Sequence, residues 1–262
     1  KNINLPKDVE KLVAPPDGLK HKLLKEVSDD VIIGGMIRSI EIMINCGTEF
    51  FCDFRENGLR GIKQLKSSLH KKPINSIILS RPNQLSFDKK EIDLLLNSSE
   101  GIAISSISDW DYSELEKISE VVRAKGKIFA LHASERIQEN IDDILDLKPN
   151  FLVHMIKGTE SDFIRIREKK IPVVICPRGN SFFGLRPDFE LMKKVGLDVL
   201  IGTDNAMLNS PNILEEISFI MSISNVYSLQ DLLFMSTIGA RKALNLTAPL
   251  PFFNTTGKFV VL

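Results

Sequence analysis

Short apolar segments of strand length alternate with longer amphipathic segments along most of the chain. Each short segment is bounded by turn residues, and a helical pattern of apolar positions follows it. Seven of them read as strands, at residues 49–54, 75–79, 102–107, 127–131, 151–155, 172–176 and 198–203. Because this alternation is typical of right-handed strand–helix–strand units, the sequence predicts an α/β protein with a parallel sheet.

The helical segments alternate with these strands as in a (β/α)8 barrel, but one strand is missing. Helices are expected at residues 29–46, 58–69, 88–96, 111–124, 137–147, 161–169, 188–195, 213–222 and 229–244. A (β/α)8 TIM-type barrel needs eight strands, and its first strand would precede the first long helix. Residues 1–20 are irregular, with one short helix and no segment apolar enough for a strand. We therefore expect a TIM-type barrel without its first strand, and one further short strand at 257–262.

Composition narrows the class of protein without naming one. Hydrophobic residues make up 43% of the chain and charged residues 26%, which excludes a disordered chain. Lys+Arg and Asp+Glu number 34 each, so charge indicates neither nucleic acid nor an anionic membrane as a partner. No apolar run reaches transmembrane length, and the start does not resemble a signal peptide. Cys46, Cys52 and Cys176 form no Cys-x-x-Cys pair, so we read them as reduced thiols of a cytoplasmic protein.

Polar side chains gather where the predicted strands end. The strand at 127–131 is followed by His132, and Glu135 lies three residues further on. Because the carboxyl ends of parallel strands meet at one edge, the residues after the other strands should converge with these two. The residues expected at this edge are Asp53, Arg55, Glu56, Arg81, Asp109, His132, Glu135, His154, Arg178, Asn180, Asp204 and Asn205. His21 and His70 fall in helical segments, and we read them as surface residues.

Three of these residues have the chemistry of metal ligands. A catalytic zinc site takes about three protein ligands and leaves one position open for water. His132 and Asp204 suit two of these places, and His154 can be a third ligand or can orient one from outside.

Each of these readings has a structural alternative. His154 can be a buried histidine with satisfied hydrogen bonds, and Asp204 can cap the turn that follows it. His132 with Glu135 can be a core histidine and a helix-capping glutamate. Asp53 and Arg81 can form an ion pair at the top of the barrel.

Four motifs in this order resemble the amidohydrolase superfamily. They are His132-Ala-Ser-Glu135, Val153-His154, Cys176-Pro177-Arg178-Gly179-Asn180 and Gly202-Thr203-Asp204-Asn205. The branch they resemble most contains cytosine deaminase, guanine deaminase and the chlorohydrolases. Adenosine deaminase is similar at the His-Ala-x-Glu element but less similar around Asp204. The resemblance covers residues 29–246.

The resemblance implies a metal-dependent hydrolase of carbon–nitrogen bonds other than peptide bonds, with hydrolytic deamination of an aminated heterocycle as the expected reaction. A water activated by a divalent metal, zinc or iron, would attack an sp² carbon. By this resemblance His132 binds the metal, and Asp204 binds the metal and takes a proton from the water. Glu135 shuttles protons to the ring nitrogen and the leaving ammonia, and His154 orients or polarises the reacting group.

Six further residues are expected to contact a small-molecule substrate at the same edge. They are Arg55, Glu56, Arg81, Arg178, Asn180 and Asn205. Loops at this end of a barrel set specificity, and arginines there suit a carboxylate, a phosphate or a carbonyl-rich group.

One departure from the family pattern is plain. The family has a His-x-His pair after its first strand, and both residues bind the metal; the printed sequence contains no His-x-His. We expect either that this strand lies upstream of the sequence or that the protein is a degenerate relative. The domains are expected to be the barrel at 1–248 and the remnant of a small flanking β domain at 249–262. The printed chain alone should hold metal weakly, and its open strand edges could pair with another chain in a homodimer.

Two other functions stay open. A catalytically impaired relative would bind a small molecule or a partner protein; the lack of His-x-His favours this reading, and the presence of Glu135 disfavours it. An unrelated barrel that binds phosphate would carry a glycine-rich loop after its last strands. Arg178-Gly179-Asn180 is too short for such a loop.

Overall fold

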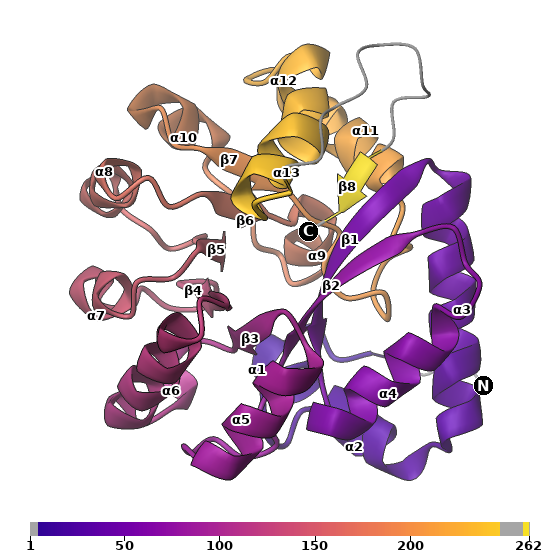
Figure 1. Cartoon of the computed structure of the whole chain (residues 1–262). Helices are drawn as coiled ribbons and strands as arrows, with labels where there is room; N and C mark the ends of the chain where they lie inside the picture. Colours follow the sequence, from indigo (N-terminus) through magenta and orange to yellow (C-terminus); the bar gives the residue numbers. More distant parts are fainter. Residues whose placement is uncertain (1–4, 247–258, 262) are drawn as a thin grey trace.

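A curled parallel sheet forms the centre of the molecule (Figure 1). The computed structural model describes residues 5–246 and 259–261. The strand order is β7-β6-β5-β4-β3-β2-β1-β8. The first seven strands are β1 (Thr48–Arg55), β2 (Asn75–Ser80), β3 (Gly101–Ile104), β4 (Ile128–Ala133), β5 (Phe151–His154), β6 (Val173–Ile175) and β7 (Val199–Ile201). All seven predicted strands are present, and the expected TIM-type architecture is confirmed as a partial barrel.

Helices cover the outer face of this sheet: α3 (Asp29–Asn45) precedes β1, and at least one helix follows each of the strands β1 to β7 (Figure 1). The others include α4 (Gly58–Ser68), α5 (Lys89–Ser98), α6 (Tyr112–Ala124), α7 (Ile141–Asp146), α8 (Glu160–Glu168), α10 (Phe189–Val195) and α11 (Ile213–Ile223). Many begin at a polar side chain that accepts a free backbone N–H, for example Asp111 before α6 and Thr159 before α8. None of the helices in the described part of the chain is long and apolar enough to cross a membrane.

Two apolar layers enclose the sheet. Along β4, Phe129 and Leu131 pack outward against the helices, whereas Ala130 faces the interior of the barrel. The interior layer also contains Leu79, Ala103, Phe151, Val153, Val174 and Leu200. Because both faces of the central strands β3 to β7 are largely buried, these strands are mostly apolar, and their polar groups lie at the ends.

The C-terminal strand lies at the edge where the first barrel strand was expected to be missing. Strand β8 (Phe259–Val261) pairs parallel with β1, on the side opposite β2. We expected this edge to be open or covered by residues outside the sequence; instead a segment of the chain itself pairs there. The predicted domain boundary at 249 falls within 247–258, outside the described residues, so the division into two domains stays a prediction.

The structure differs from the predicted helices in four places. The segment at 1–20 leads into two helices, α1 (Val9–Leu12) and α2 (Leu19–Glu26), and a short helix α9 (Pro177–Phe182) follows β6. The helix expected at 137–147 begins at Ile141, because the Asn140 side chain accepts the Asp142 N–H. The helix expected at 229–244 is divided into α12 (Leu229–Phe234), a π-helical turn (Met235–Gly239) and α13 (Ala240–Ala243).

Replacing Gly101 by alanine should destabilise the sheet. A Cβ atom at Gly101 would lie 2.0 Å from the carbonyl oxygen of Ile128 on the adjacent strand β4. Because backbone atoms cannot move aside as a side chain can, we expect the free energy of unfolding to fall by about 1–3 kcal/mol. Urea denaturation measures it.

Gly34→Ala is the matched control, since a Cβ atom there meets nothing closer than 3.8 Å, on the Arg38 side chain. Within helix α3 this change should raise the free energy of unfolding by roughly 0.5–1 kcal/mol. Equal effects of the two substitutions would contradict the close approach of β3 and β4.

Candidate functional site

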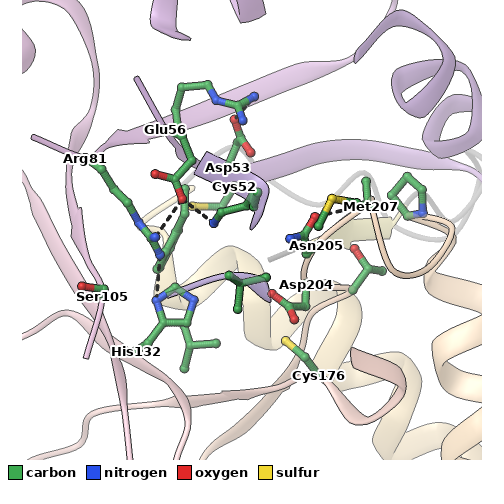
Figure 2. A pocket seen from close by; sticks show the side chains of 18 of the residues that line it. Cys52, Asp53, Glu56, Arg81, Ser105, His132, Cys176, Asp204, Asn205 and Met207 are labelled. Carbon is green, nitrogen blue, oxygen red and sulfur yellow. Dashed lines mark hydrogen bonds and ion pairs between the residues drawn. The ribbon is translucent and has the colours of Figure 1, made fainter. Parts of the chain in front are cut away.

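A cavity of about 470 Å³ opens at the carboxyl ends of the strands. Apolar side chains of α1, α2 and α3 form one wall, and polar side chains from the strand ends form the floor, several of which are labelled in Figure 2. The charged and histidine side chains of the lining are Lys20, Asp53, Arg55, Glu56, Arg81, Asp109, His132, Glu135, Arg136, His154 and Asp204. Most residues that were predicted at this edge therefore meet in one cavity.

Left-handed backbone conformations gather at these strand ends. Ser134, His154, Met155 and Asp204 have φ angles of 47°, 77°, 52° and 55°. In β5, Phe151 and Val153 face the interior, so strict alternation would direct His154 outward. The positive φ breaks the alternation, and the His154 ring instead lies 5.1 Å from the His132 ring. This backbone strain turns a polar side chain into the site.

Three potential metal ligands converge on the floor. His132, His154 and Asp204 each offer a ligand atom, and these atoms lie within 4.8 Å of one another. Two imidazoles and a carboxylate are donors that suit zinc and ferrous iron. This donor set fits the divalent metal expected from the sequence. The alternative role of Asp204 as a turn cap falls to Asn205, whose side chain accepts the Met207 N–H at 2.9 Å.

His132 is held by its neighbours in a neutral state. Its Nδ1 lies 3.2 Å from the carbonyl oxygen of Ile104 and 3.1 Å from Nη2 of Arg81. The Phe54 ring packs edge-on against it, with 5.0 Å between centroids. Burial, then Arg81, then His154 hold the pKa of His132 well below its usual value. The carbonyl can only accept and the guanidinium can only donate, so the two contacts compete for Nδ1. Nε2 is free as a metal ligand when Nδ1 carries the hydrogen and donates it to the carbonyl.

Glu135 lies beside His154 in a largely buried position. Its Oε1 is 3.5 Å from Nε2 of His154 and accepts a hydrogen bond of 3.1 Å from the Asn180 side chain. Burial raises the pKa of Glu135, and the nearby Asp204 raises it further, against the opposing effect of His154. A carboxyl group with a raised pKa is suited to taking up and releasing protons near neutral pH.

A second buried carboxylate shapes the loop that carries Glu135. Glu139 accepts the N–H of Ser134 at 2.7 Å and the N–H of Ser108 at 2.8 Å. It thereby joins the loop after β4 to the loop after β3 and stabilises the left-handed conformation of Ser134. Glu139 was not predicted from the sequence, because a glutamate in a loop carries no signal of burial.

Glu56 is shared by two cations at the other side of the floor (Figure 2). Its Oε1 accepts hydrogen bonds from Lys20 at 2.6 Å and from Arg81 at 2.8 Å. Burial alone would raise the pKa of Glu56, but Arg81 and Lys20 outweigh it and hold the pKa well below its usual range. Asp53 pairs with Arg55 at 3.3 Å, so the alternative ion pair between Asp53 and Arg81 is not the one formed.

Of the segment after β6, Cys176 and Phe183 line the cavity, whereas Arg178 and Asn180 lie behind its wall. Arg178 contacts Glu215 at 2.8 Å and the carbonyl oxygen of Ser210 at 3.2 Å, away from the lining. Asn180 is completely buried and contacts Glu135 and His154. Asn205, unlike these two, lines the cavity.

The N-terminal segment contributes residues that were not predicted. Lys20 reaches the floor from α2, a helix whose bounds were not predicted from the sequence. His21 was expected on the surface but is half-buried, with Nε2 3.1 Å from the carbonyl oxygen of Val13. His70 is exposed, as predicted.

Comparisons with known proteins point to one family. Residues 12–250 match the Amidohydrolase family. An uncharacterised protein of Methanocaldococcus jannaschii is 37% identical over 94% of this chain and 69% of its own length. A provisionally named aminohydrolase of Archaeoglobus fulgidus is 32% identical over 79% of this chain and 59% of its own length.

Solved structures share the fold at lower identity. The aminofutalosine deaminase of Helicobacter pylori superimposes with a TM-score of 0.68 and 15% identity, over 81% of this chain and 65% of that protein. An adenosine deaminase from Xanthomonas campestris with bound zinc superimposes with a TM-score of 0.67 and 17% identity, over 89% of this chain and 63% of that protein. In both cases the chain spans just under two thirds of the other protein. From the family match and the identity to the archaeal relatives, the chain belongs to the amidohydrolase family.

Proposed function

We propose that this chain is the barrel of a metal-dependent amidohydrolase that deaminates an aminated heterocycle by hydrolysis. The observation that carries the proposal is the convergence of His132, His154 and Asp204 within 4.8 Å, with Glu135 beside His154. The three potential ligands come from three different strand ends, Glu135 follows the same strand as His132, and together they offer metal ligands and a proton carrier. The family membership supports hydrolysis, and the archaeal relative named as an aminohydrolase supports a carbon–nitrogen bond.

Each residue has a distinct task in the proposed reaction. His132 and Asp204 would hold a divalent ion, with His154 near enough to assist. Such an ion would supply the acidity that lowers the pKa of a bound water to near neutrality. Asp204 accepts a proton from the attacking water, and Glu135 carries protons to the ring nitrogen and the departing amine. A carbon–oxygen bond forms, the carbon–nitrogen bond breaks, and ammonia leaves.

The cavity suits a heterocycle that carries further polar groups. Its volume of about 470 Å³ falls within the usual range of ligand sites, and apolar walls surround a polar floor. Arg81 and Lys20 supply positive charge next to His132. Solved structures with the same fold include an adenosine deaminase, an adenine deaminase and an atrazine chlorohydrolase, which supports a nitrogen-containing ring as the substrate class. A cytoplasmic location and a homodimer stay predictions.

A binding protein without catalysis is the second candidate. Arg81 places a positive charge 3.1 Å from Nδ1 of His132, which disfavours a cation beside that ring. Metal content separates the two candidates, because a pure binder of small molecules needs no tightly held ion.

Removing the metal should abolish turnover. We expect the full-length protein to contain about one tightly held zinc or iron per chain. Chelation should eliminate deaminase activity, and zinc or ferrous iron should restore it. His132→Ala should lower both metal content, measured by elemental analysis, and activity. His70→Ala, a change at an exposed histidine, should alter neither. A metal-free protein with full activity would contradict the proposal.

Glu135→Gln should separate binding from chemistry. Glutamine keeps the size of the side chain and its hydrogen bonds but cannot carry a proton. We expect turnover to fall roughly 10²–10⁴-fold, the usual contribution of acid–base catalysis. Metal content and substrate affinity should stay near those of the wild type. Steady-state kinetics on adenosine, adenine, cytosine and guanine, with calorimetric binding, measure both. Near-normal turnover would make Glu135 a structural residue.

Arginines of the lining should determine substrate affinity. Alanine at Arg55 or Arg81 should raise KM roughly tenfold or more, since a hydrogen bond to a charged group contributes about 1.5–3 kcal/mol. Arg60→Ala is the control, because Arg60 is exposed and pairs with Asp29 on the outer surface. Unchanged KM in both lining variants would remove these residues from the substrate site.

A further inference from the structure

One side chain behind the cavity touches both His154 and Glu135, the proposed proton carrier. Nδ2 of Asn180 lies 3.1 Å from Oε1 of Glu135 and 3.1 Å from Nδ1 of His154. Asn180 is completely buried in α9, whereas Glu135 follows β4 and His154 ends β5. Three separate segments thus meet at one amide group.

The two contacts match the two hydrogens of a side-chain amide. One hydrogen can be donated to the Glu135 carboxylate and the other to Nδ1 of His154. A neutral imidazole carries one hydrogen, so a ring that accepts at Nδ1 keeps its hydrogen on Nε2. That nitrogen is the one 3.5 Å from Oε1 of Glu135. The amide therefore selects which nitrogen of His154 faces Glu135 as a donor.

We propose that Asn180 is a positioning residue that fixes the tautomer of His154 and holds Glu135 against it. This assignment rests on the proposed deaminase function and replaces the expected substrate contact of Asn180. In this tautomer Nε2 presents an N–H group instead of a free lone pair. Of the two roles that the sequence left open for His154, orienting the reacting group is then favoured over metal binding.

The remaining atom of the amide argues against a purely structural role. Oδ1 of Asn180 is buried and has no hydrogen-bond partner among the residues that the structure describes. Leaving a buried acceptor unsatisfied costs about 1–3 kcal/mol, and an apolar side chain at this position would avoid that cost. The cost is understandable if the NH₂ group is needed for Glu135 and His154.

Helix α9 is fixed so that the amide cannot drift. A helix this short has little stability of its own and depends on tertiary contacts. Its start is held by Glu216 of α11, which is fully buried and accepts the N–H of Arg178 at 2.7 Å. On the cavity side, a Cβ at Gly179 would lie 2.7 Å from Oδ2 of Asp204, so the helix backbone approaches that carboxylate closely. One helix thereby contacts Glu135, His154 and Asp204.

Asn180→Asp tests the proposal with little change in shape, because it replaces the NH₂ group by an oxygen. In the full-length protein we expect kcat to fall roughly 10–100-fold, the usual effect of losing a group that orients a ligand or catalytic side chain. KM and metal content should stay near the wild-type values, whereas the thermal midpoint should fall, because the new carboxyl group is buried beside Glu135. Asn180→Ala removes the amide without adding charge, should give the same loss, and keeps the test valid if the aspartate variant fails to fold.

Asn140→Asp is the matched control. Asn140 caps α7 by accepting the Asp142 N–H at 3.0 Å, it is exposed, and aspartate caps helices equally well. The same chemical change at this position should leave kcat unchanged. A loss in both Asn140→Asp and Asn180→Asp would show a general effect of the substitution and overturn the positioning role.

Nitrogen-15 NMR of histidine-labelled protein gives a readout that does not depend on turnover. The wild type should show His154 with its hydrogen on Nε2, and Asn180→Ala should show a mixture of tautomers. An unchanged tautomer in the variant overturns the proposal, as does a changed tautomer with normal kcat. If the wild type deaminates none of the tested heterocycles, the proposed function fails, while the tautomer still decides whether Asn180 orients His154.

Discussion

The whole site depends on a sheet with two buried faces. Helices cover the outside of the strands, and the strands enclose their own side chains on the inside. Neither face can accept an unpaired charge without a large desolvation penalty. Polar residues can therefore gather only where the strands end and the chain turns toward solvent. This constraint brings His132, Glu135, His154 and Asp204 to one edge. The apolar remainder of each strand stabilises the fold.

Left-handed, strained backbone conformations orient the side chains of the site. The left-handed conformations at Ser134, His154, Met155 and Asp204 are unfavourable for side chains with a Cβ, so the surrounding contacts must compensate for them. The compensation is visible at Ser134, whose N–H is bound by Glu139, and at His154, whose ring is bound by Asn180. Strained conformations and the hydrogen bonds that hold them occur together, because a strained backbone orients a side chain reliably only if other contacts keep it in place.

Buried carboxylates supply much of that support. Glu56 joins α2 to β2 through Lys20 and Arg81, Glu139 joins two loops, and Glu216 anchors α9. Their environments differ, and their pKa values differ accordingly. Two cations lower the pKa of Glu56, whereas burial raises the pKa of Glu216 to about 7 despite the contact with Arg178. Each carboxylate binds backbone or side-chain donors from a different segment, so together they connect the elements around the cavity.

The sequence by itself determined the order of the strands, the edge at which the chemistry lies and the identity of most residues there. It could do so because strand periodicity is a local property and the carboxyl ends of parallel strands always share an edge. Helix α9 was not predicted, although the proline at its first position is a local signal that could have indicated it. Only the tertiary structure decided that Lys20 reaches the floor, that Arg81 pairs with Glu56, and that Asn180 faces Glu135 and His154. These contacts join residues far apart in the chain, and their geometry follows from packing and from backbone strain, which no local pattern encodes.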